Sequence, residues 1–156
     1  MMRRLFMLKQ DERGAALVEL ALAAPFLAAL LIGIIDLSRA YSMKYKLEQS
    51  AQRAVEKIEQ QQSVQTDYSP YGTEATTAAT AAGYSGSTAT VDYWLECDGV
   101  RQSNTTTPCN TGQTYARYVT ITVNNTYTPF FSSRAWPGAD AQGNIPISGY
   151  AGIRVQ

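Results

Sequence analysis

The sequence predicts an α+β fold, in which a long N-terminal membrane helix continues into an amphipathic helix packed on a small antiparallel sheet. Three observations predict it. An apolar run lies near the N-terminus, a helical periodicity follows it without a break, and apolar and polar residues alternate in the second half of the chain. The length of 156 residues fits one domain with an anchor and excludes a multidomain enzyme.

The apolar run AALVELALAAPFLAALLIGII covers residues 15–35. A helix of about 21 residues rises about 31 Å, which matches the hydrocarbon core of a bilayer. Arg3, Arg4, Lys9 and Arg13 precede it, and this positive flank predicts an N-terminus held in the cytoplasm. A secretory signal peptide is the alternative, but the run is longer than a signal's apolar region and no small-residue cleavage site follows it cleanly.

The helical pattern continues past Asp36 and becomes amphipathic. One helix is therefore predicted from about residue 15 to about residue 61, which is longer than a bilayer needs. Its second half offers an apolar stripe to the rest of the domain. The stripe is predicted to comprise Leu37, Tyr41, Leu47, Ala51, Ala54, Val55 and Ile58.

Residues 70–82 predict a short second helix, with Pro70 in its first turn, Thr73 as a cap and Gly83 as its stop. Three strands follow, over residues 88–97, 115–127 and 145–155, and they are expected to form an antiparallel sheet with one apolar face covered by the long helix. The residues predicted to share that face are Val91, Tyr93, Leu95, Cys97, Val119, Ile121, Val123, Ile145, Ile147, Ala151, Ile153 and Val155.

The composition narrows the classes of function. Lys and Arg number 13 against 13 Asp and Glu, so no net field gathers nucleic acid, and no nucleic-acid partner is expected. The chain has no histidine, which removes the commonest general base and the imidazole ligands of metal sites. We therefore expect no enzyme activity, no cofactor and no metal. A calcium site at Asp92, Glu96 and Asp98 stays open, because calcium needs oxygen ligands alone.

Cys97 and Cys109 bracket the polar loop CDGVRQSNTTTPC between the first two predicted strands. In an oxidising compartment such a pair is most simply a disulfide that pins the loop, worth roughly 2–4 kcal/mol. A redox or metal site is the alternative. It is disfavoured because the spacing is not C-x-x-C and no further thiol or imidazole is present.

Glu19 lies inside the apolar run, where a carboxylate costs up to about 2.5–3.5 kcal/mol and marks a functional site by default. The alternative is that it sits near the headgroups or is protonated. Gly14 directly precedes the run, and cleavage there would free the α-amino group of Ala15 four residues from Glu19, on the same helical face. That amine could pair with Glu19 of its own or a neighbouring subunit and set the register of an assembly. Pro25 removes one backbone hydrogen bond and either loosens the helix or is simply tolerated.

The run RGAALVELALAAPFLAALLIGIIDLSRAY resembles the N-terminal signature of TadE-like pseudopilins, minor components of the Tad (Flp) branch of bacterial type IV pilus systems. The segments YVTITVNNTYTPFF and IPISGYAGIRVQ are similar to the closing strands of such proteins. In that family a prepilin peptidase cuts after the glycine that is Gly14 here, and the glutamate of the fifth mature position falls on Glu19. Ala15 stands where many type IV pilins have phenylalanine, so the resemblance does not extend to its N-methylation.

The resemblance implies a type IV pilin-like fold in four parts. These are a cleaved leader over residues 1–14, a transmembrane assembly helix over 15–36, the extramembrane half of the long helix over 37–62, and an α+β head over 63–156. It also implies a protein of the bacterial inner membrane, whose head lies in the periplasm and becomes extracellular after pilus assembly.

In function, the resemblance implies a minor pilin that primes or caps a Tad/Flp pilus. The expected partners are other pilins and pseudopilins, bound through the N-terminal helix, together with the prepilin peptidase, the inner-membrane assembly platform and membrane lipid. Two alternatives stay open. One is a pseudopilin of a related secretion system, and the other is an uncleaved single-span envelope protein with a periplasmic interaction domain.

Overall fold

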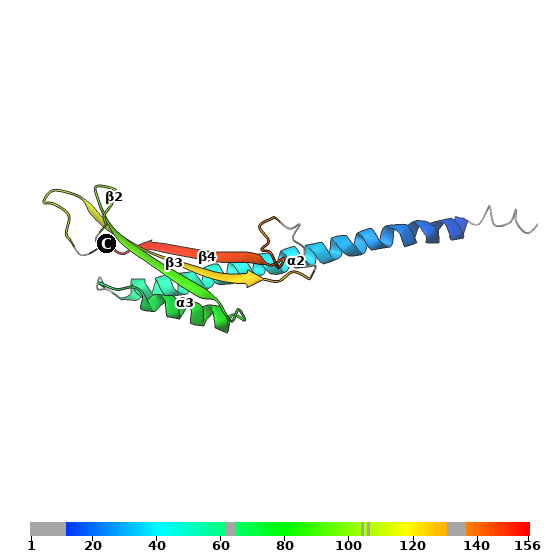
Figure 1. Cartoon of the computed structure of the whole chain (residues 1–156), viewed down its shortest axis with the longest axis horizontal. Coiled ribbons are helices and arrows are strands. Elements are labelled where there is room, and N and C mark those ends of the chain that lie inside the picture. The colour runs from blue at the N-terminus through cyan, green and yellow to red at the C-terminus, as the bar shows by residue number, and fades with distance from the viewer. Residues whose placement is uncertain (1–11, 62–64, 104, 106, 131–136) are drawn as a thin grey trace, which may run out of the picture. The chain divides into compact units, whose positions relative to one another are not determined.

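A computed structural model describes residues 12–61, 65–103, 105, 107–130 and 137–156 of the chain. Its helices are α2 (Glu12–Gln60) and α3 (Pro70–Ala81), and its strands are β1 (Thr88–Cys97), β2 (Val100–Arg101), β3 (Tyr115–Tyr127) and β4 (Ile145–Arg154) (Figure 1). The chain divides into two compact units, residues 1–38 and residues 39–156. Residues 1–11, most of the expected leader, lie outside the described part.

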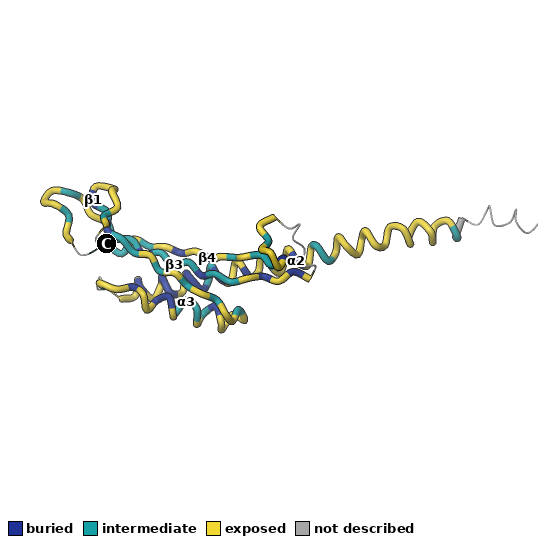
Figure 2. The backbone as a smooth tube through the Cα atoms, viewed as in Figure 1, coloured by how far each residue is buried: buried dark blue, intermediate teal, exposed yellow. Residues whose placement is uncertain are grey.

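The first unit contains the N-terminal half of α2, a helix in which apolar side chains point in all directions. The large apolar side chains from Leu17 to Ile35, except the half-buried Ile32, are 50–79 % exposed. Figure 2 shows this stretch of the backbone as mostly exposed. Such a surface is typical of a helix whose surroundings are lipid or other helices rather than water.

The second unit has one core, built where the rest of α2 and α3 meet one face of the sheet. Burying an aliphatic side chain contributes about 1.5–3 kcal/mol, so this core is the main source of stability of the unit. Its buried members from α2 are Met43, Leu47, Ala51, Ala54, Val55 and Ile58; α3 contributes Tyr71, Ala75 and Ala79, and the sheet contributes Val119, Ile121, Val123, Tyr127 and Ala151. The predicted α+β fold is confirmed.

The sheet is antiparallel, with the strand order β2-β1-β3-β4. Val91 lies opposite Ile121, which lies opposite Ala151, so apolar residues of three strands share the covered face. Gly149 of β4 lies so close to α2 that a Cβ atom there would collide with the backbone of Leu47 and Glu48. Glycine therefore permits the close approach of strand and helix.

The prediction that Leu37 and Tyr41 belong to the buried apolar stripe is wrong. Leu37 is 65 % and Tyr41 is 72 % exposed. At about 100° per residue, Leu37 and Tyr41 lie roughly 80° and 120° away from Leu47 around the helix axis, whereas Met43 lies about 40° away. Met43 therefore takes the place that the sequence interpretation gave to Tyr41.

Helix α3 confirms the predicted stop and corrects the predicted cap. Thr73 lies inside the helix, and Ser69 occupies the N-cap position without a side-chain hydrogen bond. Gly83 follows the helix with a φ of 96°. Its N–H donates to the Thr80 carbonyl at 3.0 Å, and the Tyr84 N–H donates to Ala79 at 2.9 Å, which is the pattern of a Schellman motif.

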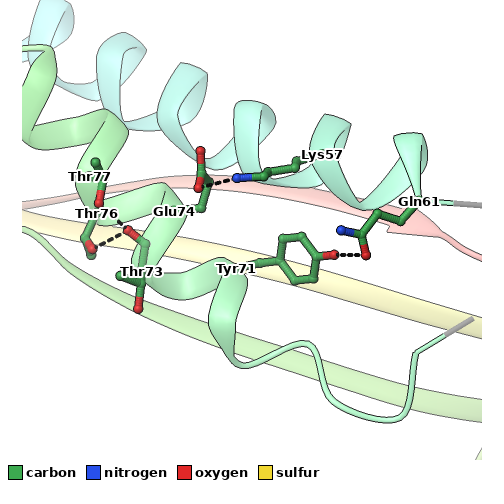
Figure 3. A network of polar contacts seen from close by, with 7 residues as sticks. All are labelled: Lys57, Gln61, Tyr71, Thr73, Glu74, Thr76 and Thr77. Atoms are coloured by element: carbon green, nitrogen blue, oxygen red, sulfur yellow. Dashed lines mark hydrogen bonds and ion pairs between the residues drawn. The ribbon is translucent and has the colours of Figure 1, made fainter.

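Two polar contacts connect α3 with the last turn of α2 and with Gln61, the residue that follows it (Figure 3). Lys57 Nζ donates to Glu74 Oε2 at 2.6 Å, and Tyr71 Oη donates to Gln61 Oε1 at 2.7 Å. The Lys57 and Glu74 side chains are 50 % and 44 % exposed. Water screens such a pair to about 0–1 kcal/mol, so it orients α3 more than it stabilises it.

The sheet has a fourth strand that the sequence interpretation missed. Strand β2 follows β1 through the two-residue turn Asp98-Gly99, in which φ is 50° and 78°. Positive φ at both central residues is characteristic of the type I′ turn, whose twist matches that of a hairpin. The Asp-Gly dipeptide was the signal in the sequence. The last strand also ends one residue earlier than predicted, at Arg154.

Candidate functional site

The predicted processing site lies in the first turn of α2. The helix begins at Glu12, a little before the residue 15 expected from the sequence, and includes Gly14 and Ala15. Gly14 is half-buried and Ala15 is exposed. Glycine weakens a helix by about 1 kcal/mol relative to alanine. Gly14 therefore makes the first turn of α2 easier to unfold.

Glu19 lies one turn beyond Ala15 and on the same face of α2, because residues four apart are neighbours on a helix surface. Its side chain is exposed. The ion pairs and hydrogen bonds of the described residues leave the Glu19 carboxylate without a protein partner. Within a single chain, the apolar helix thus carries an unpaired acidic group.

Pro25 lies inside α2, which continues through it. Proline has no N–H, so the carbonyl of Ala21 lacks its usual helical donor. Further along, Gly33 has no atom within 4 Å of the position that a Cβ would take. Packing within the second unit therefore gives no reason for a glycine at residue 33, unlike at Gly149.

The helical segment from Gly14 onward is long and apolar enough to cross a membrane. None of its most apolar window is buried by the described chain. A soluble protein's core helix of similar composition would be mostly covered. The N-terminal apolar helix therefore indicates membrane anchoring.

The two cysteines form a disulfide, Cys97–Cys109, with Cα atoms 5.7 Å apart. Asp98 closes the base of the same loop, since its carboxylate accepts hydrogen bonds from Thr114 N and Thr114 Oγ1, each at 2.9 Å. The hydrogen bond from the Thr114 backbone is the main cause that lowers the pKa of Asp98 below its usual range. The loop is thus fixed covalently at one point and by a charged acceptor at another.

A cluster on the outer face of the sheet fixes β2. Arg101 forms two hydrogen bonds with Asp92, at 2.8 and 3.1 Å, and its guanidinium lies 4.6 Å from the centre of the Trp94 ring. Trp94 Nε1 donates to Glu96 Oε1 at 2.7 Å, and its ring stacks on Tyr118 with centroids 5.4 Å apart. The sequence interpretation missed this cluster, because it depends on the hairpin that places Arg101 over β1.

The carboxylates weighed as a calcium site are used in protein contacts. Asp92 pairs with Arg101, Glu96 accepts from Trp94, and Asp98 accepts from Thr114. Across the described ranges, no group of three or more Cys, Asp or Glu residues is placed to hold a metal ion. The three acids therefore act as hydrogen-bond acceptors that organise the loop and β2.

Comparison with known families identifies the helical segment. Residues 14–56 match the family model described as TadE-like protein. No curated protein and no solved structure matches the chain significantly. The match begins at Gly14 and extends through the apolar half of α2 into the amphipathic half. The resemblance recognised in the sequence is confirmed for this segment, which is similar to TadE-like proteins. The expected similarity of the closing strands lies outside the match.

Proposed function

We propose that the protein is a minor pilin, or pseudopilin, of a Tad/Flp type IV pilus, processed by a prepilin peptidase after Gly14. The observation that carries the proposal is the N-terminal half of α2, where an exposed apolar surface holds an unpaired Glu19 five residues after Gly14. The TadE-like match over residues 14–56 supports the proposal that the protein belongs to a Tad pilus system. The protein primes or caps the pilus, because its folded second unit is larger than a subunit made of the apolar helix alone.

Cleavage after Gly14 changes the electrostatics of the helix end. It makes Ala15 the first residue and places its new ammonium group at the positive end of the helix dipole, which is unfavourable. The same cut exposes backbone N–H groups that have no helical acceptor. A carboxylate nearby offsets both effects, and Glu19 is the acidic residue of the apolar run.

Pairing between subunits turns this charge into a specificity element. In a layer of low dielectric, an unpaired carboxylate costs several kcal/mol, whereas a carboxylate next to an ammonium group is stabilised. A subunit whose Glu19 meets the Ala15 amine of its neighbour therefore enters the bundle in one axial register. Every other register leaves two charges uncompensated, which disfavours it.

In this proposal, the apolar helix and the second unit lie in different compartments before assembly. Before assembly, the apolar helix lies in the inner membrane, where it contacts lipid, the peptidase and the assembly platform. The second unit lies in the periplasm, an oxidising compartment in which a disulfide such as Cys97–Cys109 persists. After assembly, the apolar helix contacts other pilins and the second unit is exposed on the pilus.

The test of this proposal is the substitution Glu19→Ala in the producing bacterium, with pili counted by electron microscopy. We expect cleavage and membrane insertion to continue, while piliation falls at least about tenfold, since a lost charge pair in a low-dielectric site is worth more than about 1.4 kcal/mol. Glu19→Asp keeps the charge on a shorter side chain and should retain part of the piliation.

The matched control is Glu56→Ala, which removes an exposed carboxylate from the amphipathic half of the same helix. It should leave piliation at the wild-type level. Normal pili in the Glu19→Ala strain would refute the pairing role. A photoreactive residue at position 18 adds a direct readout, because it should cross-link to the N-terminal residues of a neighbouring pilin in the wild type.

A further inference from the structure

A pocket of about 130 Å³ opens in the second unit at the end of the sheet where β1 finishes and β3 begins. Its floor includes Leu95, Arg117 and Val155. Arg117 lies opposite Leu95 in the register of β1 and β3. On its other side, the Val155 N–H donates to the Arg117 carbonyl at 2.8 Å. The backbone that carries Arg117 is therefore fixed by strands on both sides.

Two tyrosines form a rigid apolar wall of this pocket. Tyr68 is 4 % exposed, and its ring centre lies 5.6 Å from that of Tyr93. The Gln65 N–H donates to the Tyr68 hydroxyl at 3.1 Å, which fixes the turn before α3 over the pocket. Because the tyrosines pack on each other and on the core, the pocket is formed before any ligand arrives.

The charge of the pocket is unbalanced. Among the described residues, the Nε atom of Arg117 is the buried side-chain donor that has no hydrogen-bond partner. The lining residues that belong to the described part of the chain include no acidic side chain. A guanidinium that is partly removed from water without a counter-charge is costly, and an anion in the pocket recovers part of that cost.

Other arginines of the same unit show what a satisfied guanidinium looks like here. Arg101 forms its two hydrogen bonds with Asp92 and lies over Trp94. Arg154 donates from Nε to the Gln156 carbonyl at 2.8 Å and from Nη2 to the Tyr115 carbonyl at 3.3 Å. Arg117 differs from both, because it lines a pocket and its Nε has no hydrogen-bond partner among the described residues.

We propose that this pocket binds a small organic acid through its carboxylate. The planar guanidinium presents parallel N–H donors that match the two oxygens of a carboxylate better than a point charge does. Tyr68, Tyr93 and Leu95 offer apolar surface to a short hydrocarbon or aromatic body. The volume is below the roughly 300–1,000 Å³ that drug-sized ligands occupy, so the ligand is small, on the scale of benzoate.

This site is independent of pilus assembly and of processing, since the residues that form it belong to the second unit. An extended acidic peptide fits less well, because a pocket of about 130 Å³ is too small for a chain of several residues. The proposed ligand is therefore a free monocarboxylate, and failure of the pilin proposal would leave this site unaffected.

The test is a titration of the full chain, ¹⁵N-labelled and held in lipid nanodiscs, with sodium benzoate. The arginine Nε–Hε signals are recorded by NMR, and the Arg117 signal is assigned by its loss in Arg117→Gln. Benzoate should move the Arg117 signal in a saturable way, whereas benzamide, which has the same shape without the charge, should not. Movement of several arginine signals to an equal extent would indicate general salt effects and overturn the proposal.

Variants separate the charge from the fold. Arg117→Lys keeps the positive charge but loses the parallel N–H donors of the guanidinium. It should raise the benzoate dissociation constant about tenfold, measured through the Tyr68 and Tyr93 ring signals. Arg101→Lys is the matched control and should leave the constant within about twofold, because Arg101 is engaged with Asp92. Backbone spectra show whether each variant is folded. A benzoate dissociation constant that is unchanged in the folded Arg117→Lys and Arg117→Gln variants would contradict the proposal that Arg117 binds the carboxylate.

Discussion

The two halves of α2 share one backbone helix and have opposite relations to the rest of the chain. Between Leu17 and Ile35, all large apolar side chains except Ile32 are at least half exposed, although this stretch is the most apolar part of the protein. Beyond Arg39, the helix is amphipathic, and Leu47, Ala51 and Ala54 have no exposed surface. Apolarity by itself therefore does not predict burial within the chain.

The difference teaches that the two halves are stabilised by different partners. The amphipathic half finds its partner in the same chain, on the apolar face of β3 and β4. The apolar half has a surface on every side that only lipid or other helices can cover. Changes in the amphipathic half should therefore alter folding of the second unit, and changes in the apolar half should alter insertion or assembly.

The largest contrast is expected between two glycines. Gly149→Val places a side chain where the α2 backbone at Leu47 and Glu48 already lies, and neither can yield by a rotamer change. We expect a loss of about 4 kcal/mol or more in the free energy of unfolding. Gly33→Val in the apolar half has open space around it and should leave that free energy unchanged.

Chemical denaturation of both full-length variants in nanodiscs, followed by tyrosine fluorescence, measures this contrast. A Gly149→Val protein as stable as the wild type would show that β4 does not press on the helix. The amphipathic half would then not depend on close packing against β4.

A second contrast compares two leucines in the same helix. Leu47 is 0 % exposed, so Leu47→Ala removes a core side chain and should cost about 3 kcal/mol. Leu27 is 56 % exposed, and Leu27→Ala should leave unfolding of the second unit within about 0.5 kcal/mol of the wild type. The same denaturation experiment applies, and similar losses in both variants would erase the distinction between the halves.

The disulfide sharpens the comparison by adding a constraint within the second unit alone. The double variant Cys97→Ser, Cys109→Ser removes the covalent link between two residues that are 12 positions apart in the sequence. Loop-closure entropy predicts a loss of about 2–3 kcal/mol in stability. Insertion of the apolar helix into membranes should stay at the wild-type level, as measured by resistance to carbonate extraction. Reduced insertion would couple two regions that the account keeps separate.

The smallest effect is expected at Asp98, on the surface of that loop. The Thr114 hydrogen bonds lower the pKa of Asp98, so its contribution to stability is complete above the reference pKa of about 3.9 and is lost as pH falls through the lowered pKa. Asp98→Asn should therefore lose less stability than the wild type between pH 6 and pH 2. Equal acid sensitivity, measured by thermal unfolding, would show that these hydrogen bonds contribute nothing.

Much of the fold could be predicted from local patterns. The bounds of β1 and β3 agree with the sequence prediction residue for residue, because alternation along a strand needs no knowledge of its neighbours. Leu37 and Tyr41 were misplaced because spacings of three and four residues fit several phases of a helix. Only the position of the sheet selects the phase that contains Met43.

The functional residues also fall into those that could be predicted from the sequence and those that could not. Glu19 and Gly14 could be found from the sequence, because an acid in an apolar run is conspicuous and its neighbours lie close along the chain. The Arg117 pocket could not, since its lining residues come together only when the turn before α3, strands β1 and β3 and the residue after β4 are assembled. No local pattern distinguishes Arg117 from a solvated arginine.

The most direct test of the central claim is the mass of the protein isolated from assembled pili. We expect a chain that begins at Ala15, so that a free α-amino group lies one turn from Glu19 in the apolar half of α2. N-terminal sequencing would identify Ala15 as the first residue of that chain. A chain in working pili that still carries Met1 to Gly14 would contradict the account, because Glu19 would then have no terminal ammonium group to meet.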